Sequence, residues 1–166
     1  AFLDFGSAEK DKSLVLRNVA APYWDVNSGK VKGVVSAKIV YDANCKDCYS
    51  PDIPVNQLRN ANVYVPDNKI TTIDASTQEG KDLIALYRAE KLPLVLFSSD
   101  LEEYPNIVFR WNILGSVTTD GKYLYAAAAP YLDLATGKVV GKVNVTYLTY
   151  RECTVCYDVQ ATHRQI

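Results

Sequence analysis

Apolar positions along the chain occur in short runs separated by polar turn signals, a pattern typical of β-strands. The runs are rich in Val, Tyr and Ile, and the turns contain Gly next to Lys, Ser or Thr. They predict two β-hairpins. The first has strands at residues 14–23 and 31–41 joined by a turn at 26–30, and the second has strands at 123–131 and 139–150 joined by a turn at 134–138.

A further turn signal, Thr-Thr-Asp-Gly-Lys at residues 118–122, predicts another hairpin just before the second of these. Its strands would be residues 113–117 and 123–127. Asp11 and Lys12 hold the corresponding turn position near the start of the chain.

The central part of the chain mixes helical and strand patterns. Residues 55–61 predict a short helix, and the apolar run at 70–74 predicts a strand. A Ser-Thr-Gln-Glu capping signature opens a predicted helix over residues 76–90. The continuous apolar run at 92–97 predicts a buried strand with Pro93 near its start.

An internal repeat relates the two predicted hairpins. Residues 20–49 and 128–157 align without a gap at an offset of 108, and thirteen of these thirty positions are identical. Upstream, a Gly-Ser pair at residue 6 matches another at residue 115 with a one-residue slip. Such self-similarity is typical of proteins built from tandem units. We interpret the chain as about one and a half repeats, with the second copy as an incomplete stump.

Charge and composition exclude several classes of function. The chain has 18 Lys and Arg against 19 Asp and Glu, so it lacks the basic surface typical of nucleic-acid-binding proteins. No apolar run approaches the roughly 18–20 residues of a membrane-spanning helix. We therefore expect neither a nucleic-acid partner nor a membrane span. Because the sequence has no Met, we expect a processed or excised chain.

The four cysteines form two C-x-x-C pairs at equivalent positions of the repeat, Cys45/Cys48 and Cys153/Cys156. In an oxidising compartment, each pair predicts a permanent disulfide that ties the end of a strand to the following turn. A four-cysteine zinc site is the alternative, but it requires two equivalent units to meet at one metal. We therefore expect no metal and no cofactor.

The order of the predicted elements after residue 35 is strand, C-x-x-C, short helix, strand, helix, proline, strand and hairpin strand. Over residues 35–127 this order resembles the thioredoxin fold, in which a C-x-x-C follows the first core strand. In that family a cis-proline opens the strand that runs beside the dithiol. The resemblance matches Cys45 and Cys48 to the dithiol and Pro93 to this proline.

The resemblance implies thiol–disulfide exchange with a protein disulfide as substrate. Cys45 would attack as the thiolate, Cys48 would resolve the mixed disulfide, and Pro93 would shape the substrate groove. A structural disulfide remains open beside this interpretation. The structural role is favoured for Cys153 and Cys156, because no complete thioredoxin site can follow them within the chain.

The repeated β segments predict self-association. A chain that begins and ends with the same segment has matching ends, and a head-to-tail contact that does not close gives a filament. A strand rich in Val, Tyr and Thr can add to the sheet edge of a neighbour. The alternative is that both hairpins pack within one chain.

Asn144 begins an Asn-Val-Thr sequon, a glycosylation candidate in an extracellular protein.

Together these patterns predict an α/β (α+β) fold in three parts. An N-terminal β-hairpin segment at 1–34 precedes a thioredoxin-like core at 35–127, and a C-terminal β segment at 128–166 repeats residues 20–49. We expect an extracellular or cell-surface structural protein, such as a filament subunit joined head to tail. A thiol–disulfide oxidoreductase is the alternative function, and the cytoplasm of a hyperthermophile the alternative location.

Overall fold

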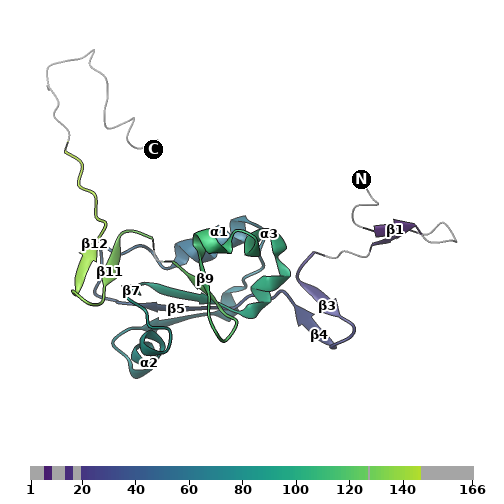
Figure 1. Ribbon diagram of the computed structural model, residues 1–166, viewed down its shortest axis with the longest axis horizontal. Coiled ribbons are helices and arrows are strands. Elements are labelled where there is room, and N and C mark those ends of the chain that lie inside the picture. Colours follow the sequence, from purple (N-terminus) through teal and green to yellow (C-terminus); the bar gives the residue numbers. More distant parts are fainter. Residues whose placement is uncertain (1–5, 9–13, 17–19, 127, 147–166) are drawn as a thin grey trace, which may run out of the picture.

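The computed structural model describes residues 6–8, 14–16, 20–126 and 128–146 of the chain (Figure 1). A five-stranded sheet lies at the centre of the molecule. In spatial order its strands are β6 (Ile70–Asp74), β5 (Ala37–Tyr41), β8 (Leu94–Phe97), β10 (Tyr123–Tyr125) and β9 (Gly115–Val117). β5 and β6 are parallel, whereas the pairs β5–β8, β8–β10 and β10–β9 are antiparallel.

Helices cover both faces of this sheet (Figure 1). One face carries α1 (Asp52–Asn60), α3 (Pro105–Val108) and α4 (Trp111–Leu114), and the other carries α2 (Gln78–Leu86). Two 3-10 segments, η2 (Asp67–Lys69) and η3 (Ser99–Glu103), complete the helical elements of the described residues. This mixture of helices and sheet confirms the predicted α+β class. No helix in the described part of the chain is long and apolar enough to cross a membrane.

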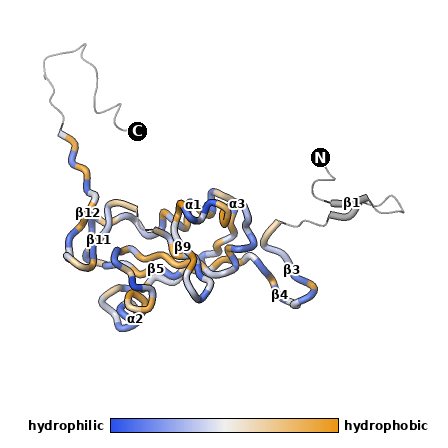
Figure 2. Tube along the Cα trace, viewed as in Figure 1, coloured by the Kyte–Doolittle hydropathy of each residue, from blue (hydrophilic) through white to orange (hydrophobic). Residues whose placement is uncertain are grey.

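Strand β8 joins the two halves of the hydrophobic core. All four of its residues are buried, and successive side chains point to opposite faces of a strand. Val95 and Phe97 therefore pack in the cluster beneath α1, whereas Leu94 and Leu96 pack in the cluster beneath α2. Figure 2 shows the corresponding hydrophobic band through the centre of the molecule.

The predicted central elements are present with shifted boundaries. The strand predicted at 70–74 is β6, and the helix predicted at 55–61 is α1. The helix predicted at 76–90 is shorter. Its N-cap is Thr77, whose hydroxyl accepts a hydrogen bond from the Gly80 amide at 3.1 Å. The helix ends at Leu86, just before Arg88 adopts a positive φ of 49°.

Short antiparallel hairpins lie outside the central sheet. β1 pairs with β2, β3 with β4 and β11 with β12, and β11 pairs on its other side with β7. These strands are β1 (Gly6–Ala8), β2 (Leu14–Leu16), β3 (Tyr23–Asp25), β4 (Lys30–Lys32), β7 (Lys91–Leu92), β11 (Tyr131–Asp133) and β12 (Lys138–Val140). The two predicted repeat hairpins are thus present as β3–β4 and β11–β12.

Three strands that the apolar pattern predicted as continuous are each divided by a proline. Pro22 follows β2 and precedes β3, Pro93 separates β7 from β8, and Pro130 lies between β10 and β11. Each of these prolines has a cis peptide bond before it. Because proline has no amide hydrogen to donate, it interrupts the hydrogen-bond ladder of a strand.

Two other predicted strands stop at equivalent glycines. Gly33, with a φ of +80°, separates β4 from β5, and Gly141, with a φ of +86°, follows β12. A Cβ atom at these positions would lie 2.5 and 2.4 Å from an alanine Cβ, so both positions require glycine. Residues 141–146 belong to no strand, and 147–150 lie outside the described residues.

The hairpin predicted around residues 118–122 is formed by β9 and β10, but it begins later than expected. Residues 113 and 114 belong to helix α4, so the first strand starts at Gly115. The equivalent turn predicted at Asp11 and Lys12 lies outside the described residues, between β1 and β2.

Candidate functional site

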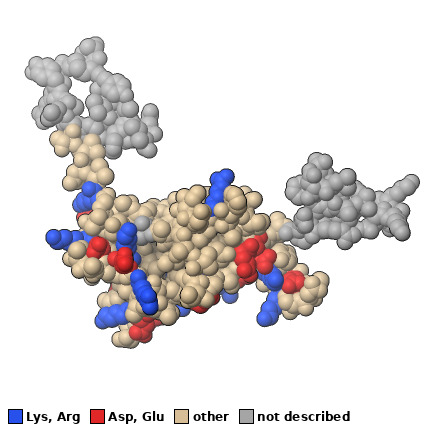
Figure 3. Space-filling view, in the orientation of Figure 1, with Lys and Arg blue, Asp and Glu red and all other residues tan. Residues whose placement is uncertain are grey.

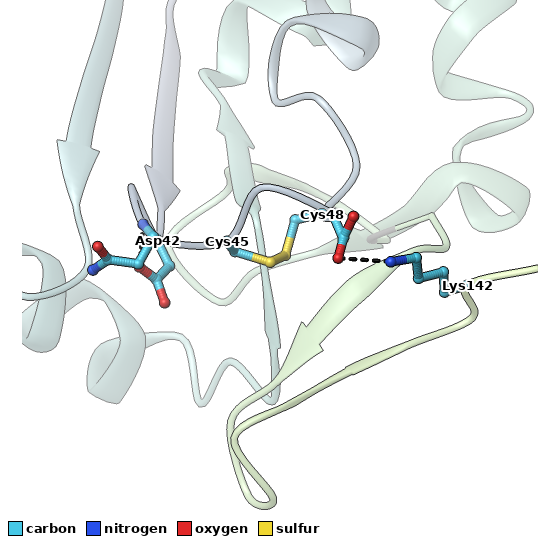
Figure 4. The surroundings of a disulfide bond; sticks show 6 residues. Asp42, Cys45, Cys48 and Lys142 are labelled. Carbon is cyan, nitrogen blue, oxygen red and sulfur yellow. Dashed lines mark hydrogen bonds and ion pairs between the residues drawn. A yellow bond between two sulfur atoms is a disulfide. The ribbon is translucent and has the colours of Figure 1, made fainter.

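The first C-x-x-C occupies the loop that follows strand β5. Cys45 and Cys48 form a disulfide there, with their Cα atoms 5.5 Å apart (Figure 4). Asp42 shapes the loop, because its carboxylate accepts a hydrogen bond from the Asn44 amide at 2.8 Å and its carbonyl accepts one from the Cys45 amide at 3.1 Å. Both cysteines are partly exposed. Their disulfide also excludes them from serving together as zinc thiolates.

Helix α1 begins beyond the disulfide loop. Its first residue is Asp52, and Pro51 occupies the N-cap position without a side-chain cap. A helix N-terminus lowers the pKa of a thiol that lies within its first turn. Here both Cys45 and Cys48 precede that turn in the chain, so neither is a capping residue of the helix.

Pro93 reaches the same end of the sheet as the disulfide loop. Strand β8 pairs antiparallel with β5, and Val40 lies opposite Leu94. Extending this register by one residue places buried Pro93 opposite Tyr41, after which the chain enters the C-x-x-C loop. The structure thus brings the two sequence-predicted features, the cysteine pair and the proline, to one edge of the core.

The second repeat hairpin packs at this same edge. Leu132 of β11 pairs with Leu92 of β7, and the Leu134 amide donates a hydrogen bond to the Glu90 carbonyl at 2.9 Å. Leu132 and Leu134 pack against the core cluster beneath α2, which contains Leu92 and Ile73. The β11–β12 hairpin is therefore part of the packed structure in the described chain.

Two polar contacts connect the disulfide loop to the chain around this hairpin. The Tyr49 amide donates a hydrogen bond to the Pro130 carbonyl. Asp47, which lies between the cysteines, forms an ion pair with Lys142 at 2.8 Å (Figure 4). Burial and a hydrogen bond with Tyr125 raise the pKa of the Tyr49 phenol. The disulfide loop thus contacts the chain both before and after the β11–β12 hairpin.

The first repeat hairpin lies at the opposite end of the core (Figure 1). The Tyr23 hydroxyl donates a hydrogen bond to Glu103 at 2.7 Å, and Lys32 forms an ion pair with Glu103 at 3.6 Å. The Tyr104 hydroxyl donates to the Gly33 carbonyl at 2.7 Å. Figure 3 shows acidic and basic side chains close together at this end. These contacts attach the hairpin to the core that follows it in the chain.

The two repeat hairpins have the same turn geometry. In each, a glycine amide donates to an aspartate carbonyl at 2.8 Å, from Gly29 to Asp25 in the first and from Gly137 to Asp133 in the second. The two glycines have φ angles of +62° and +65°. Both aspartate carboxylates accept further hydrogen bonds within their turns. These bonds lower the carboxyl pKa of both residues.

Acid is expected to weaken both hairpin turns. Hydrogen bonds from Ser28 lower the pKa of Asp25 in the folded chain, and those from Thr136 lower that of Asp133. A depressed carboxyl pKa stabilises the fold above the unfolded value of about 3.9, and this contribution is lost as pH falls through the folded pKa. Carboxyl titration by NMR should give folded pKa values for Asp25 and Asp133 below the unfolded value of about 3.9.

The control for this pH dependence is Asp133→Asn, which retains an acceptor oxygen but cannot titrate. In this variant the acid-induced change in amide exchange of the second turn should disappear, while that of the first turn persists. Asp133 titrating at the ordinary aspartate value in the folded chain would contradict the expectation.

A cavity of about 380 Å³ lies beside Pro93, and sequence reasoning missed it. Its walls include Tyr87 and Arg88 after helix α2, Asn112 of α4 and Tyr125 of β10. Neither Cys45 nor Cys48 lines it. The walls come from segments far apart in the chain, so no local sequence pattern could have indicated the cavity.

The remaining predicted site residues are the second cysteine pair and the sequon. Cys153 and Cys156 lie outside the described residues, so their pairing stays a prediction. Asn144 of the sequon is exposed in the segment that belongs to no strand. Within the described ranges, no three His, Cys, Asp or Glu side chains are placed to hold a metal ion.

The chain was compared with models of protein families, with curated proteins and with solved structures. None of these comparisons gives a significant match.

Proposed function

We propose that the chain is a repeat-built structural module of an extracytoplasmic protein, in which a thioredoxin-like core packs against the β-hairpin of the adjoining repeat. The observation that carries this proposal is the position of β11–β12. This hairpin belongs to the second copy of the sequence repeat, and it pairs with β7 beside the disulfide loop of the core. Successive units would thus be joined through a hairpin that each shares with its neighbour.

The order of elements supports the thioredoxin-like part of the proposal. Two parallel strands, β5 and β6, lie beside two antiparallel strands, β8 and β10, with helices on both faces. The C-x-x-C follows the first of these strands, and Pro93 immediately precedes the third. These positions along the chain support the proposed resemblance.

The contacts of the disulfide loop support a structural role for the Cys45–Cys48 bond. The bond closes a short loop that holds the chain on either side of β11–β12, through Tyr49 and Pro130 and through Asp47 and Lys142. Permanent disulfides are typical of oxidising compartments. An extracellular or cell-surface location follows from this role, and the cytoplasm of a hyperthermophile is the alternative.

Removing the disulfide tests this role. Cys45→Ser/Cys48→Ser is expected to lower the free energy of unfolding by about 2 kcal/mol, the loop-closure value for so short a ring, without abolishing the fold. Urea denaturation would measure the loss. In a Cys153→Ser/Cys156→Ser background, which leaves one pair to titrate, the remaining disulfide should resist glutathione buffers and show no turnover with insulin.

Thiol–disulfide exchange is the second candidate, favoured by the approach of Pro93 to the end of β5. The reduced Cys45 thiolate would attack a substrate disulfide, releasing one substrate thiolate and forming a mixed disulfide. Cys48 would then displace the second substrate thiol, leaving the pair oxidised and the substrate reduced by two electrons. Turnover that requires a dithiol reductant and is abolished by Cys45→Ser would establish this function and contradict the structural role.

A further inference from the structure

Apolar side chains that are packed in the second repeat hairpin are exposed in the first. At the offset of 108, Trp24 and Val26 correspond to Leu132 and Leu134. The leucines pack against the core cluster that contains Leu92, whereas Trp24 is 61% and Val26 81% exposed. Large apolar groups exposed together at an edge strand are typical of an interaction surface.

The backbone of the first hairpin shows the same difference. β11 pairs with β12 on one side and with β7 on the other, whereas β3 pairs only with β4 among the described residues. One edge of β3 therefore presents backbone groups whose counterparts in β11 are hydrogen-bonded to β7 of the core.

The N-terminal hairpin β1–β2 differs from its repeat counterpart β9–β10 in the same way, because one of its strands has a free edge among the described residues. Gly6 lies opposite Leu16 just as Gly115 lies opposite Tyr125, so β1–β2 has the register of β9–β10 shifted by the one-residue slip. The other edge of β10 pairs with β8 and completes the central sheet. Within the described ranges, β2 has no strand in the place of β8.

At the opposite end of the described chain, residues after β12 are exposed although their repeat counterparts are buried. Val143 is 82% exposed, but its repeat counterpart Val35 is completely buried in the core. Val145 is likewise exposed, whereas its counterpart Ala37 begins the buried strand β5. The residues after β12 thus correspond in sequence to the start of a core strand but are exposed in this chain.

We infer that the free edges of β2 and β3 are a docking surface for the β8 and β7 strands of a preceding unit of the same kind. The occupant is a core equivalent to residues 35–110, which lacks its own last strands and receives β1–β2 and β3–β4 in their place. A second copy of this chain does not offer that surface, because its own β10 and β11 occupy it. The inference rests on the repeat-built function proposed above.

The contacts of β11 with β7 within the chain predict those of β3 at the proposed interface. Trp24 would lie opposite the preceding unit's counterpart of Leu92, and Asp25 opposite that of Lys91, as Leu132 and Asp133 do here. The Val26 amide would donate to the counterpart of the Glu90 carbonyl. Burial of the Trp24 side chain in an apolar cluster supplies the main driving force, and the strand ladder fixes the register.

The test is a longer chain in which a second copy of residues 35–110 precedes the complete sequence. The added segment should fold, and the Val26 amide should exchange with solvent at least about tenfold more slowly than in the original chain. Trp24→Asp in the longer chain should remove this protection. Protection of the Leu134 amide, which donates to Glu90 in both chains, is the internal control.

An added segment that stays unfolded, or a Val26 amide that exchanges equally fast in both chains, would overturn the inference. The proposed function fails by a different result, a Cys45–Cys48 pair that turns over with a protein disulfide. A redox-active pair with a protected Val26 would refute only the structural role of the disulfide. An inert disulfide with an unprotected Val26 would refute only the interface.

Discussion

Leu132→Asp is expected to lower the free energy of unfolding by about 2–3 kcal/mol, whereas the equivalent change Trp24→Asp should alter it by no more than about 0.5 kcal/mol. Leu132 packs against the cluster around Leu92, so an aspartate there loses apolar burial and places a charge against the core. Trp24 occupies the same repeat position but is largely exposed. The two variants thus compare one hairpin position in a packed and an unpacked state.

Urea denaturation followed by circular dichroism measures both changes. Amide exchange shows where the structure is destabilised, because Leu132→Asp should break the hydrogen bond from the Leu134 amide to the Glu90 carbonyl while leaving strand β8 protected. Leu132→Met is the matched control, since it keeps an apolar side chain of similar size and should cost less than about 1.5 kcal/mol. Equal losses for Leu132→Asp and Trp24→Asp would show that the first hairpin is packed to the same degree as the second.

Local patterns predicted the elements better than their boundaries. The turns at 26–30 and 134–138 form because aspartate and glycine satisfy the tight hairpin geometry within a few residues. The strand at 70–74 and the N-cap near residue 77 are equally local features. The apolar runs do not predict the divisions at Pro22 and Pro130, because hydropathy carries no information on the missing amide hydrogen of proline.

The arrangement of the candidate site required three-dimensional information. The sequence contained the C-x-x-C, Pro93 and the repeat, but it did not show that all three meet at one edge of the core. The register of β5 with β8 brings the first two together, and the pairing of β7 with β11 adds the repeat hairpin. The ion pair between Asp47 and Lys142 is a further contact between residues distant in the chain. The repeat counterpart of Lys142 is Val34, so the repeat itself did not indicate this ion pair.

The structure shows where the residues of the second copy lie. The sequence predicts that this copy, which begins near Trp111, is incomplete; its described residues form β9 and β10 of the central sheet and the packed hairpin β11–β12. The first copy provides β1–β2 and β3–β4, which lie outside that sheet. Sequence identity shows that two segments are related, but only the strand pairing shows which of them completes a core.

Trp111→Ala tests whether the second copy is integral to the core, and its expected cost is about 3–5 kcal/mol. Trp111 is buried beneath the sheet, with its ring edge-to-face with Phe97 at 6.0 Å and with Tyr123 at 5.2 Å between centroids. Its indole Nε1 donates a hydrogen bond to the Ser116 carbonyl at 3.0 Å. One side chain thus holds β8, β9 and β10 together, and its loss leaves a cavity and an unpaired carbonyl.

Because a domain of this size is stable by only about 5–15 kcal/mol, Trp111→Ala should shift the urea midpoint strongly or unfold the chain. Trp111→Phe keeps an aromatic ring but loses the indole donor, so its smaller loss of about 1–2 kcal/mol remains measurable if the alanine variant does not fold. Phe109→Ala, at an exposed neighbouring position, should change stability by less than about 0.5 kcal/mol. If Trp111→Phe and Phe109→Ala were equally harmless, β9 and β10 would be attached to the core only by their backbone pairing, and the second copy would be a peripheral addition.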